Sequence, residues 1–319
     1  MGVAGASRTG LDRVTISILE CLDKLDARPE HRYVKSARVV DLAYSSRAIP
    51  PRFGYEAMCA NAADWLTQLL LVDIHGNIGS ADDLDEPALP RYTEARMTYP
   101  GWMAIAAERG ELPRLPIGLI NGDLAFGGTA PPFDPVRIAS ALHAAVKGAS
   151  DAELVELVGL PAFRIACSVD GDLAALASGA ASTLTLSARV AIEADERGSR
   201  LVVSHFPWSV GPGDASQVLA ARADAERHRD LNAHQPDLFD RMRIRLRDIR
   251  NESHDDIERL VCELDPDADP EVCRERVLET WPVTTEFPVQ LRAPLPRLLH
   301  EINDGSDAQQ EAITALIAS

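Results

Sequence analysis

The segment LLLVDIHGNIGS, residues 69 to 80, places the firmest limit on how this chain can fold. Aliphatic residues lead into a polar stretch that contains Gly76 and Gly79, and glycine permits backbone angles that other residues resist. The segment therefore predicts a strand followed by a glycine-rich loop. Before it, apolar residues repeat at helical spacing over 10–25, and a further helix is predicted from residue 54 to about 69.

Between these two helices, residues 28–51 indicate a short helix, a turn and a second short helix, which the Pro50-Pro51 pair ends. Helix, turn, helix and strand in this order favour a winged-helix module.

The rest of the chain mixes strand and helix patterns. Residues 182–210 alternate apolar and polar side chains and break at residues 196–198, which predicts a β-hairpin. The other expected elements are a loop at 112–133, a capping box from Ser150 to Glu153, a helical insertion at 214–241, strands at 243–253 and 259–266, a helix at 268–281 with Asp269 as N-cap, and a helical tail from 295. The expected fold class is therefore α+β.

Charge is distributed unevenly along the 319 residues, a length typical of about two domains. The net charge of −17 argues against a chain-wide affinity for nucleic acid, since phosphate binding needs clustered Lys and Arg. Residues 28–52, however, hold six Lys or Arg against two acids, whereas residues 214–319 hold 13 Arg against 23 acids. The basic stretch is either a solvated face or a phosphate-binding surface.

Cysteine usage and hydropathy indicate a reduced, cytoplasmic protein. The cysteines are Cys21, Cys59, Cys167, Cys262 and Cys273. Their number is odd and no CxxC pair is present, which supports neither a zinc nor a redox motif. No apolar run approaches the ~18 residues of a membrane span, and residues 1–10 lack the apolar centre of an export signal.

Three stretches carry a family resemblance: YVKSARVV (33–40), LLLVDIHGNIGS (69–80) and RYTEARM (91–97). In this order they resemble the breakage-reunion domain of type IIA topoisomerases, the family of the DNA gyrase A protein and its topoisomerase IV counterpart. LPRLPIGLING (112–122) followed by APP (130–132) resembles the family's next block, and residues 248–279 resemble its tower domain.

The resemblance implies a nucleophile at Tyr92. In this family the tyrosine of the RYTE motif attacks a DNA phosphodiester and forms a covalent 5′-phosphotyrosine, which holds the break until it is resealed. A free phenol has a pKa of about 10 and is a poor nucleophile at pH 7, and an adjacent cation favours phenolate. Arg91 is the candidate cation. A packed aromatic ring with no chemistry is the alternative reading of Tyr92.

The resemblance also implies phosphate contacts and partners. The expected DNA-binding residues are Arg13, Lys35, Arg38, Arg47 and Arg52. The expected partners are double-stranded DNA and a gyrase B-like ATPase subunit, in a homodimer within a heterotetramer. Mg²⁺ and ATP are expected on that ATPase partner, and this chain is expected to hold no metal. Asp82, Asp83, Asp85 and Glu86 are interpreted as a solvated loop.

The implied organisation is a winged-helix-like cleavage domain over 1–110, a tower-like α/β domain over 111–300 and a helical tail over 301–319. We expect neither the coiled coil and gate that close the family's dimer nor its C-terminal β-pinwheel, so that a dimer would use the winged-helix surfaces.

The chain also departs from the family pattern. The family's His-Pro-His-Gly run, which supplies imidazoles near the scissile phosphate, is replaced by residues 47–50, Arg-Ala-Ile-Pro. Arginine supplies charge but cannot act as a general acid near pH 7. Asp12 stands where the family has a basic or imidazole group, and the loop in which the family inserts an isoleucine into DNA is shorter, with Leu124 or Phe126 as substitutes.

Three functions stay open. The first is a reduced gyrase A-like topoisomerase component that cleaves DNA through Tyr92. The second is a catalytically weak or inactive relative that binds DNA or modulates a topoisomerase, which the net charge and the lost histidines favour. The third is a globular protein that reuses the fold without DNA.

Overall fold

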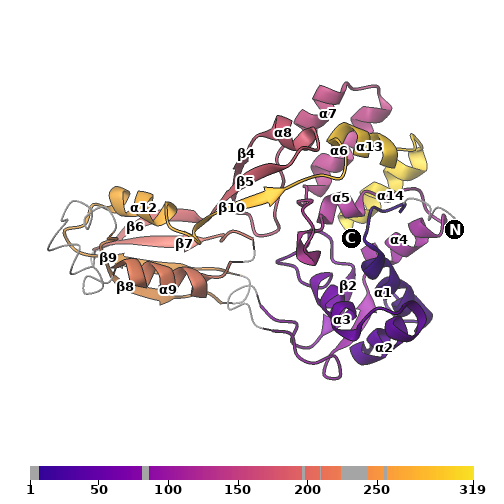
Figure 1. Cartoon of the computed structure of the whole chain (residues 1–319), viewed down its shortest axis with the longest axis horizontal. Coiled ribbons are helices and arrows are strands. Elements are labelled where there is room, and N and C mark those ends of the chain that lie inside the picture. Colours follow the sequence, from indigo (N-terminus) through magenta and orange to yellow (C-terminus); the bar gives the residue numbers. More distant parts are fainter. Residues whose placement is uncertain (1–6, 81–85, 196–197, 209, 224–242, 255–256) are drawn as a thin grey trace.

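Two separate apolar cores divide the molecule into two lobes (Figure 1). The computed structural model describes residues 7–80, 86–195, 198–208, 210–223, 243–254 and 257–319. We name residues 7–187 and 284–319 the main lobe, whose core extends from Ile18 to Leu316 in sequence. The described residues within 188–283 form the sheet lobe, whose core lies between Ala188 and Val283. The sheet lobe projects from the main lobe and gives the molecule an elongated shape.

The main lobe begins with α1 (Arg13–Lys24), which confirms the predicted amphipathic helix. The Asp12 carboxylate accepts hydrogen bonds from the backbone amides of Val14 and Thr15, an N-cap that contributes about 1 kcal/mol. Asp12, which replaces the basic or imidazole group of the family pattern, therefore has a structural role, because its side chain caps the start of the helix.

The region after α1 differs from the prediction. The first short helix expected within 28–51 is wrong, because β1 (Val34–Lys35) joins a sheet with a strand some sixty residues later in sequence. A single helix follows, α2 (Ser36–Arg47), and it ends at Ala48, which adopts a left-handed conformation with φ of 55°.

The next helix, α3 (Pro51–Ala60), ends well before residue 69, where the prediction placed its end. Its C-terminus is fixed by Asn61, whose carbonyl accepts from the amides of both Leu71 and Val72. These two bonds turn the chain towards the sheet. They join residues about ten positions apart, so a helical sequence pattern could not predict them.

β2 (Val72–His75) and β3 (Glu94–Met97) complete a three-stranded antiparallel sheet with the order β1-β3-β2. The predicted strand and glycine loop are confirmed. Gly76 has φ of 122°, and a Cβ there would lie 2.9 Å from the methyl group of Thr93, so this close approach requires glycine.

The remainder of the main lobe packs on the same core. It contains α4 (Tyr99–Glu108), α5 (Ile117–Asn121), η1 (Leu124–Phe126), α6 (Pro135–Val146), α7 (Asp151–Val158), β4 (Ser168–Gly171), α8 (Leu173–Ala177), β5 (Ser182–Ser187), β10 (Thr284–Val289), α13 (Leu295–Ile302) and α14 (Asp307–Ala318). The capping box at Ser150 and the helical tail are confirmed. The loop expected over 112–133 is wrong in part, because it contains α5 and η1.

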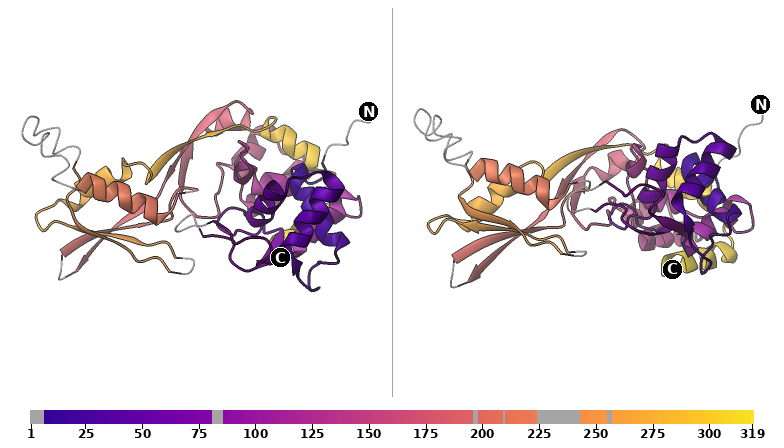
Figure 2. Two further views of the ribbon diagram at one scale, coloured as in Figure 1. Left: turned by 60° about the horizontal axis from the view of Figure 1, so that its bottom comes forward. Right: turned by 90° about the horizontal axis from the view of Figure 1, so that it is seen from below.

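The sheet lobe contains β6 (Arg189–Asp195), β7 (Gly198–Ser204), α9 (Pro212–Ala223), β8 (Leu246–Asn251), β9 (Leu260–Leu264) and α12 (Pro270–Leu278), with the strand order β6-β7-β9-β8. Both helices cover one side of this sheet (Figure 2). Strands β8 and β9 and the Asp269 N-cap of α12 are confirmed.

The hairpin predicted over 182–210 is right for β6 and β7 only. Strand β5 pairs instead with β4 and β10 in the main lobe, where Leu184 and Leu186 are fully buried. Of the insertion predicted over 214–241, α9 is helical, and residues 224–242 lie outside the described residues.

None of the helices in the described part of the chain combines the length and the apolar character that crossing a bilayer requires. The boundaries at residues 110 and 300 stay a prediction.

Candidate active site

Tyr92 lies in a tight turn that leads into β3, and 64% of its surface is exposed. Its backbone amide donates to the Leu89 carbonyl at 2.9 Å, which closes the turn. The ring therefore faces solvent from a fixed backbone position, where a phosphodiester can approach it.

Hydrogen bonds from buried hydroxyl groups hold that turn in place. Thr93 is fully buried and its hydroxyl donates to Ser36 Oγ at 2.8 Å. The hydroxyl of Tyr55, on α3, donates to the Ala88 carbonyl at 2.6 Å and lies 3.0 Å from Thr93 Oγ1. Burial raises the pKa of Tyr55 to about 12, so this phenol stays protonated and keeps donating. Thr93, which follows Tyr92, is thereby connected through side-chain hydroxyl contacts to both α2 and α3.

The N-terminus of α2 packs directly against the same turn. The Ser36 amide donates to the Thr93 carbonyl at 3.0 Å, and the Ala37 amide donates to the Pro90 carbonyl at 3.1 Å. The positive end of the helix dipole therefore lies beside residues 90–93, which favours a negatively charged group there.

Arg91 lies over the ring of its neighbour. Its guanidinium carbon is 4.8 Å from the centroid of the Tyr92 ring, a cation–π geometry. The predicted pair thus lies together on the surface, with the cation on the face of the ring.

The cations predicted to bind DNA are all exposed, and they lie on four elements. Arg13 begins α1, Lys35 ends β1, Arg38 and Arg47 lie in the first and last turns of α2, and Arg52 lies in the first turn of α3. Lys35 and Arg38 flank the Tyr92 turn, whereas Arg47 is about 13 Å further along the helix axis. The structure therefore brings only part of the predicted set next to Tyr92.

Three of these cations already have carboxylate partners. Lys35 Nζ is 3.0 Å from Glu94, Arg52 is 2.6 Å from Glu56, and Arg47 pairs with Glu20. Exposed pairs of this kind contribute about 0–1 kcal/mol, so a phosphate can replace the carboxylate at little cost.

Arg13 and Arg38 have no ion-pair partner within the part of the chain that the structure describes. They are the cations of the predicted set most readily available to an incoming phosphate.

Sequence reasoning missed the exposed face of the β1-β3-β2 sheet, which adjoins Tyr92. The strand register places two rows of side chains across this face: Lys35, Glu94 and His75 in the row nearer Tyr92, and Tyr33, Arg96 and Asp73 in the next. The period-two alternation of VDIH and EARM could have placed these residues on one face.

Contacts between the rows hold this face together. The rings of Tyr33 and His75 stack with centroids 3.7 Å apart, and the Arg96 guanidinium lies 4.4 Å from the Tyr33 centroid. Asp73 accepts from the Tyr33 hydroxyl and pairs with Arg96 at 3.1 Å. Burial, together with the hydrogen bond to Asp73, raises the pKa of Tyr33.

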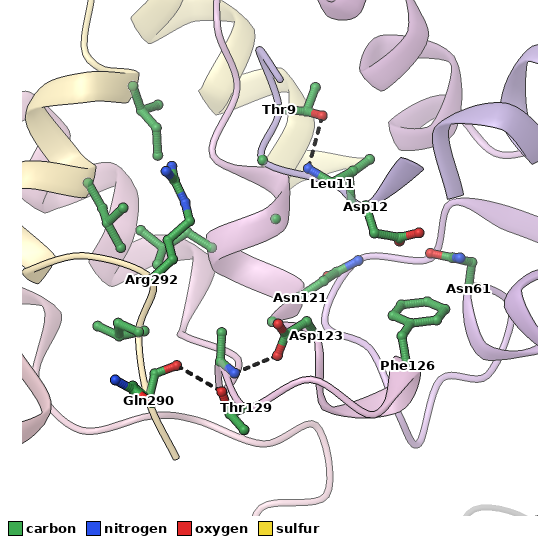
Figure 3. A pocket seen from close by; sticks show the side chains of 18 residues that line it. Thr9, Leu11, Asp12, Asn61, Asn121, Asp123, Phe126, Thr129, Gln290 and Arg292 are labelled. Carbon is green, nitrogen blue, oxygen red and sulfur yellow. Dashed lines mark hydrogen bonds between the residues drawn. The ribbon is translucent and has the colours of Figure 1, made fainter. Parts of the chain in front are cut away.

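A separate cavity of about 370 Å³ lies where the start of α1 meets the α5–η1 loop and the chain before α13 (Figure 3). Asp12 and Asp123 line it, and Asp123 accepts from the Ala130 amide. Burial raises the pKa of Asp123. Phe126 also lines this cavity, and Leu124 packs against the main core.

No group of three or more His, Cys, Asp or Glu side chains within the described ranges is arranged to hold a metal ion. In the acidic loop, Asp82, Asp83 and Asp85 lie outside the described residues, and Glu86 is exposed. All five cysteines are free thiols.

Comparison with known proteins shows a gyrase A-like relationship. The chain is 26% identical over 316 residues to the A subunit of DNA gyrase from Dehalogenimonas lykanthroporepellens, a match that covers 90% of this chain. It is 27% identical over 325 residues to the same protein of Streptococcus pneumoniae, with 92% of the chain covered. The counterpart from Streptococcus pyogenes serotype M3 is also 27% identical, over 315 residues. The chain spans 36–37% of the length of these relatives. No family model matches it.

Proposed function

We propose that this chain is a gyrase A-like component of a type II DNA topoisomerase, which cleaves and reseals duplex DNA through Tyr92. The observation that carries the proposal is the placement of the Tyr92 ring. It is exposed on a turn that buried hydroxyl groups hold rigid, with a guanidinium on its face and a helix N-terminus beside it. The ring is thus open to a phosphodiester, unlike a ring buried for packing such as that of Tyr55.

In this proposal, α2, α3 and the β1-β3-β2 sheet belong to a winged-helix-like cleavage domain over residues 1–110. Residues 111–300 are a tower-like domain, and 301–319 are a helical tail. The order of helix, turn, helix and antiparallel strands supports the winged-helix part of this proposal.

The chemistry is a reversible transesterification. The phenol of Tyr92 gives up its proton as its oxygen attacks a backbone phosphorus, the phosphorus–O3′ bond breaks, and O3′ takes up a proton, so that a 5′-phosphotyrosine and a free 3′-hydroxyl remain. Attack by that hydroxyl reverses the step and releases the tyrosine. Bond energy is retained in the covalent link, so resealing requires no new donor. Arg91 and the N-terminus of α2 favour the negative charge that develops on the phosphate.

DNA is held by phosphate contacts rather than by base reading. Lys35 and Arg38 flank the turn that carries Tyr92, and Arg13, Arg47 and Arg52 extend the contact over α1–α3. The partners are double-stranded DNA and a gyrase B-like ATPase subunit, in a heterotetramer with two copies of this chain. Mg²⁺ and ATP belong to that partner, which would supply charge neutralisation at the phosphate and energy for strand passage.

A second function is favoured by the charge of the chain. The net charge of −17 and the engagement of Lys35, Arg47 and Arg52 with carboxylates would suit a non-cleaving DNA-binding protein or a modulator of a topoisomerase.

Trapping of cleavage complexes separates the two functions. The chain is mixed with a gyrase B-type ATPase subunit, Mg²⁺ and supercoiled plasmid, and the mixture is denatured with detergent. We expect protein-linked linear DNA from the wild type and none from Tyr92→Phe.

Tyr44→Phe is the matched control, because Tyr44 on α2 is 59% exposed and lies outside the proposed site. It should cleave like the wild type. DNA binding by the wild type without any trapped product, across partners and divalent cations, would favour the modulator.

A further inference from the structure

Cleavage of the phosphodiester needs a proton donor, and neither Tyr92 nor the cations around it can serve as one. When the phosphorus–O3′ bond breaks, the leaving oxygen must gain a proton. Arginine cannot supply it, which excludes Arg91 and Arg47. A lysine ammonium ordinarily holds its proton up to about pH 10.4, which makes lysine a poor donor near pH 7. Histidine is the side chain whose ordinary charge change falls within about pH 5–8.

Residues 1–110 contain two histidines, His31 and His75. The sheet register places these two histidines at different distances from Tyr92. His75 is directly opposite Glu94, and Tyr92 precedes Glu94 by two residues. His31 precedes Tyr33 on the side of the sheet that leads away from Tyr92, and its ring lies 3.2 Å from Asp26.

The connection from His75 to Tyr92 is short whatever the shape of the turn. Paired Cα atoms in an antiparallel ladder lie about 5 Å apart, and two residues span at most about 7 Å. The Cα atoms of His75 and Tyr92 are therefore within about 12 Å of each other. Side chains that start at this separation can contact the same phosphodiester from two sides.

The imidazole of His75 is held in place yet open to a ligand. Its ring stacks on Tyr33 at 3.7 Å, and Tyr33 is in turn fixed by its hydrogen bond to Asp73. The residue is nevertheless exposed, and neither of its ring nitrogens has a hydrogen-bond or ion-pair partner within the described residues. Stacking without hydrogen bonding fixes the ring and leaves both nitrogens for substrate.

The charged groups around His75 compensate one another. Those that face it are Asp73 on its own strand, Glu94 and Arg96 on β3, and Lys35 and Tyr33 on the β1 side. Glu94 pairs with Lys35 and Asp73 pairs with Arg96, so neither carboxylate is an ion-pair partner of the imidazole.

We propose that His75 is the general acid of the cleavage step, an assignment that rests on the proposed function. As the Tyr92 oxygen bonds to phosphorus and the O3′ bond breaks, a ring nitrogen of the His75 imidazolium gives its proton to O3′. In resealing, the neutral imidazole takes that proton back as O3′ attacks phosphorus and the Tyr92 oxygen leaves.

The test uses His75→Gln, which keeps a polar side chain but cannot titrate, and two duplex substrates. One is ordinary DNA. The other carries sulfur in place of the bridging O3′ at the cleavage site, and a thiolate leaves without protonation because the pKa of a thiol is only about 8.5. His31→Gln is the matched control.

We expect His75→Gln to lower the rate of covalent-complex formation on ordinary DNA by about 100-fold, and to flatten its pH dependence. On the sulfur-containing duplex it should react within a few-fold of the wild type. His31→Gln should resemble the wild type on both. A merely structural role for His75 would give equal losses on the two substrates.

The outcomes separate this assignment from the function on which it rests. Equal losses on the two substrates, or no loss on ordinary DNA, overturn His75 as the acid while cleavage through Tyr92 stands. Failure of the wild type to cleave either duplex, with partner and Mg²⁺ present, overturns both proposals.

Discussion

The two lobes differ in how some of their exposed arginines are paired: α1 and α2 each carry one without an ion-pair partner among the described residues, whereas several on the strands of the sheet lobe are engaged by carboxylates. In the main lobe, Arg13 and Arg38 are exposed and have no ion-pair partner among the described residues, and Arg91 lies over Tyr92. On the sheet lobe, Arg200 and Arg250 are engaged by carboxylates on neighbouring strands. An unpaired cation can contact a phosphate at once, whereas a paired one must first give up its partner.

The pairing on the sheet lobe follows from its strand register. Arg200 is opposite Glu263 on β9 and opposite Glu193 on β6, and Arg259 also binds Glu193 at 3.2 Å. Glu263 receives hydrogen bonds from both Arg247 and Arg250. These contacts give each of the arginines named here a carboxylate partner. If the proposed function holds, we expect phosphate affinity to be concentrated in the main lobe, despite the acidic total.

The salt dependence of DNA binding gives the largest effect expected from this contrast. Arg13→Gln combined with Arg38→Gln should weaken binding and reduce the slope of log K against log salt by about two, since each phosphate contact contributes about 0.9. Fluorescence anisotropy with a duplex at several salt concentrations measures it.

Arg250→Gln in the sheet lobe is the matched control and should leave that slope unchanged. Equal slopes for the main-lobe and sheet-lobe variants would mean that the two lobes do not differ in phosphate affinity.

Loss of the hydroxyl of Tyr55 should have a smaller effect. Tyr55→Phe keeps the buried ring but removes the hydrogen bond to the Ala88 carbonyl, which should cost about 1 kcal/mol of unfolding free energy. Because this bond steadies the turn before Tyr92, the yield of trapped cleavage complex should fall several-fold while DNA affinity is kept. Chemical denaturation and the trapping assay measure the two quantities. A parallel loss of DNA affinity would argue against a positioning role.

The smallest expected effect is a loss of local stability in acid. Hydrogen bonds from Arg247 and then Arg250 lower the pKa of Glu263 to about 2. A lowered folded-state pKa stabilises above the unfolded value of about 4.3, and this contribution is lost as pH falls towards 2. Amide-exchange protection of β8 and β9 should therefore decline between these pH values. In Glu263→Gln, protection should already be weaker at neutral pH and should decline less in acid.

Local patterns predicted the parts of the fold that local contacts determine. α1 follows from its apolar period, and α12 follows from Asp269, whose carboxylate caps its first turn. β1 was missed because its two residues become a strand only through pairing with Ala95 and Glu94. The early end of α3 depends on Asn61 meeting Leu71 and Val72, and no propensity encodes that contact.

In the candidate site, too, features that depend on neighbouring residues could be predicted, whereas contacts between distant residues could not. Tyr92 and Arg91 follow from a motif of adjacent residues, and the Arg52–Glu56 pair has the i, i+4 spacing of a helix. The pairing of Lys35 with Glu94 joins residues far apart in sequence, as does the stacking of Tyr33 on His75. Both require the sheet register, which one sequence does not supply.

Mass spectrometry of the trapped complex decides whether Tyr92 is the nucleophile. After nuclease and protease digestion, we expect one modified peptide, with a nucleotide joined through its 5′-phosphate to the oxygen of Tyr92. An adduct on another residue, a 3′-phosphate linkage, or an unmodified Tyr92 peptide from protein that has cleaved DNA would contradict this assignment.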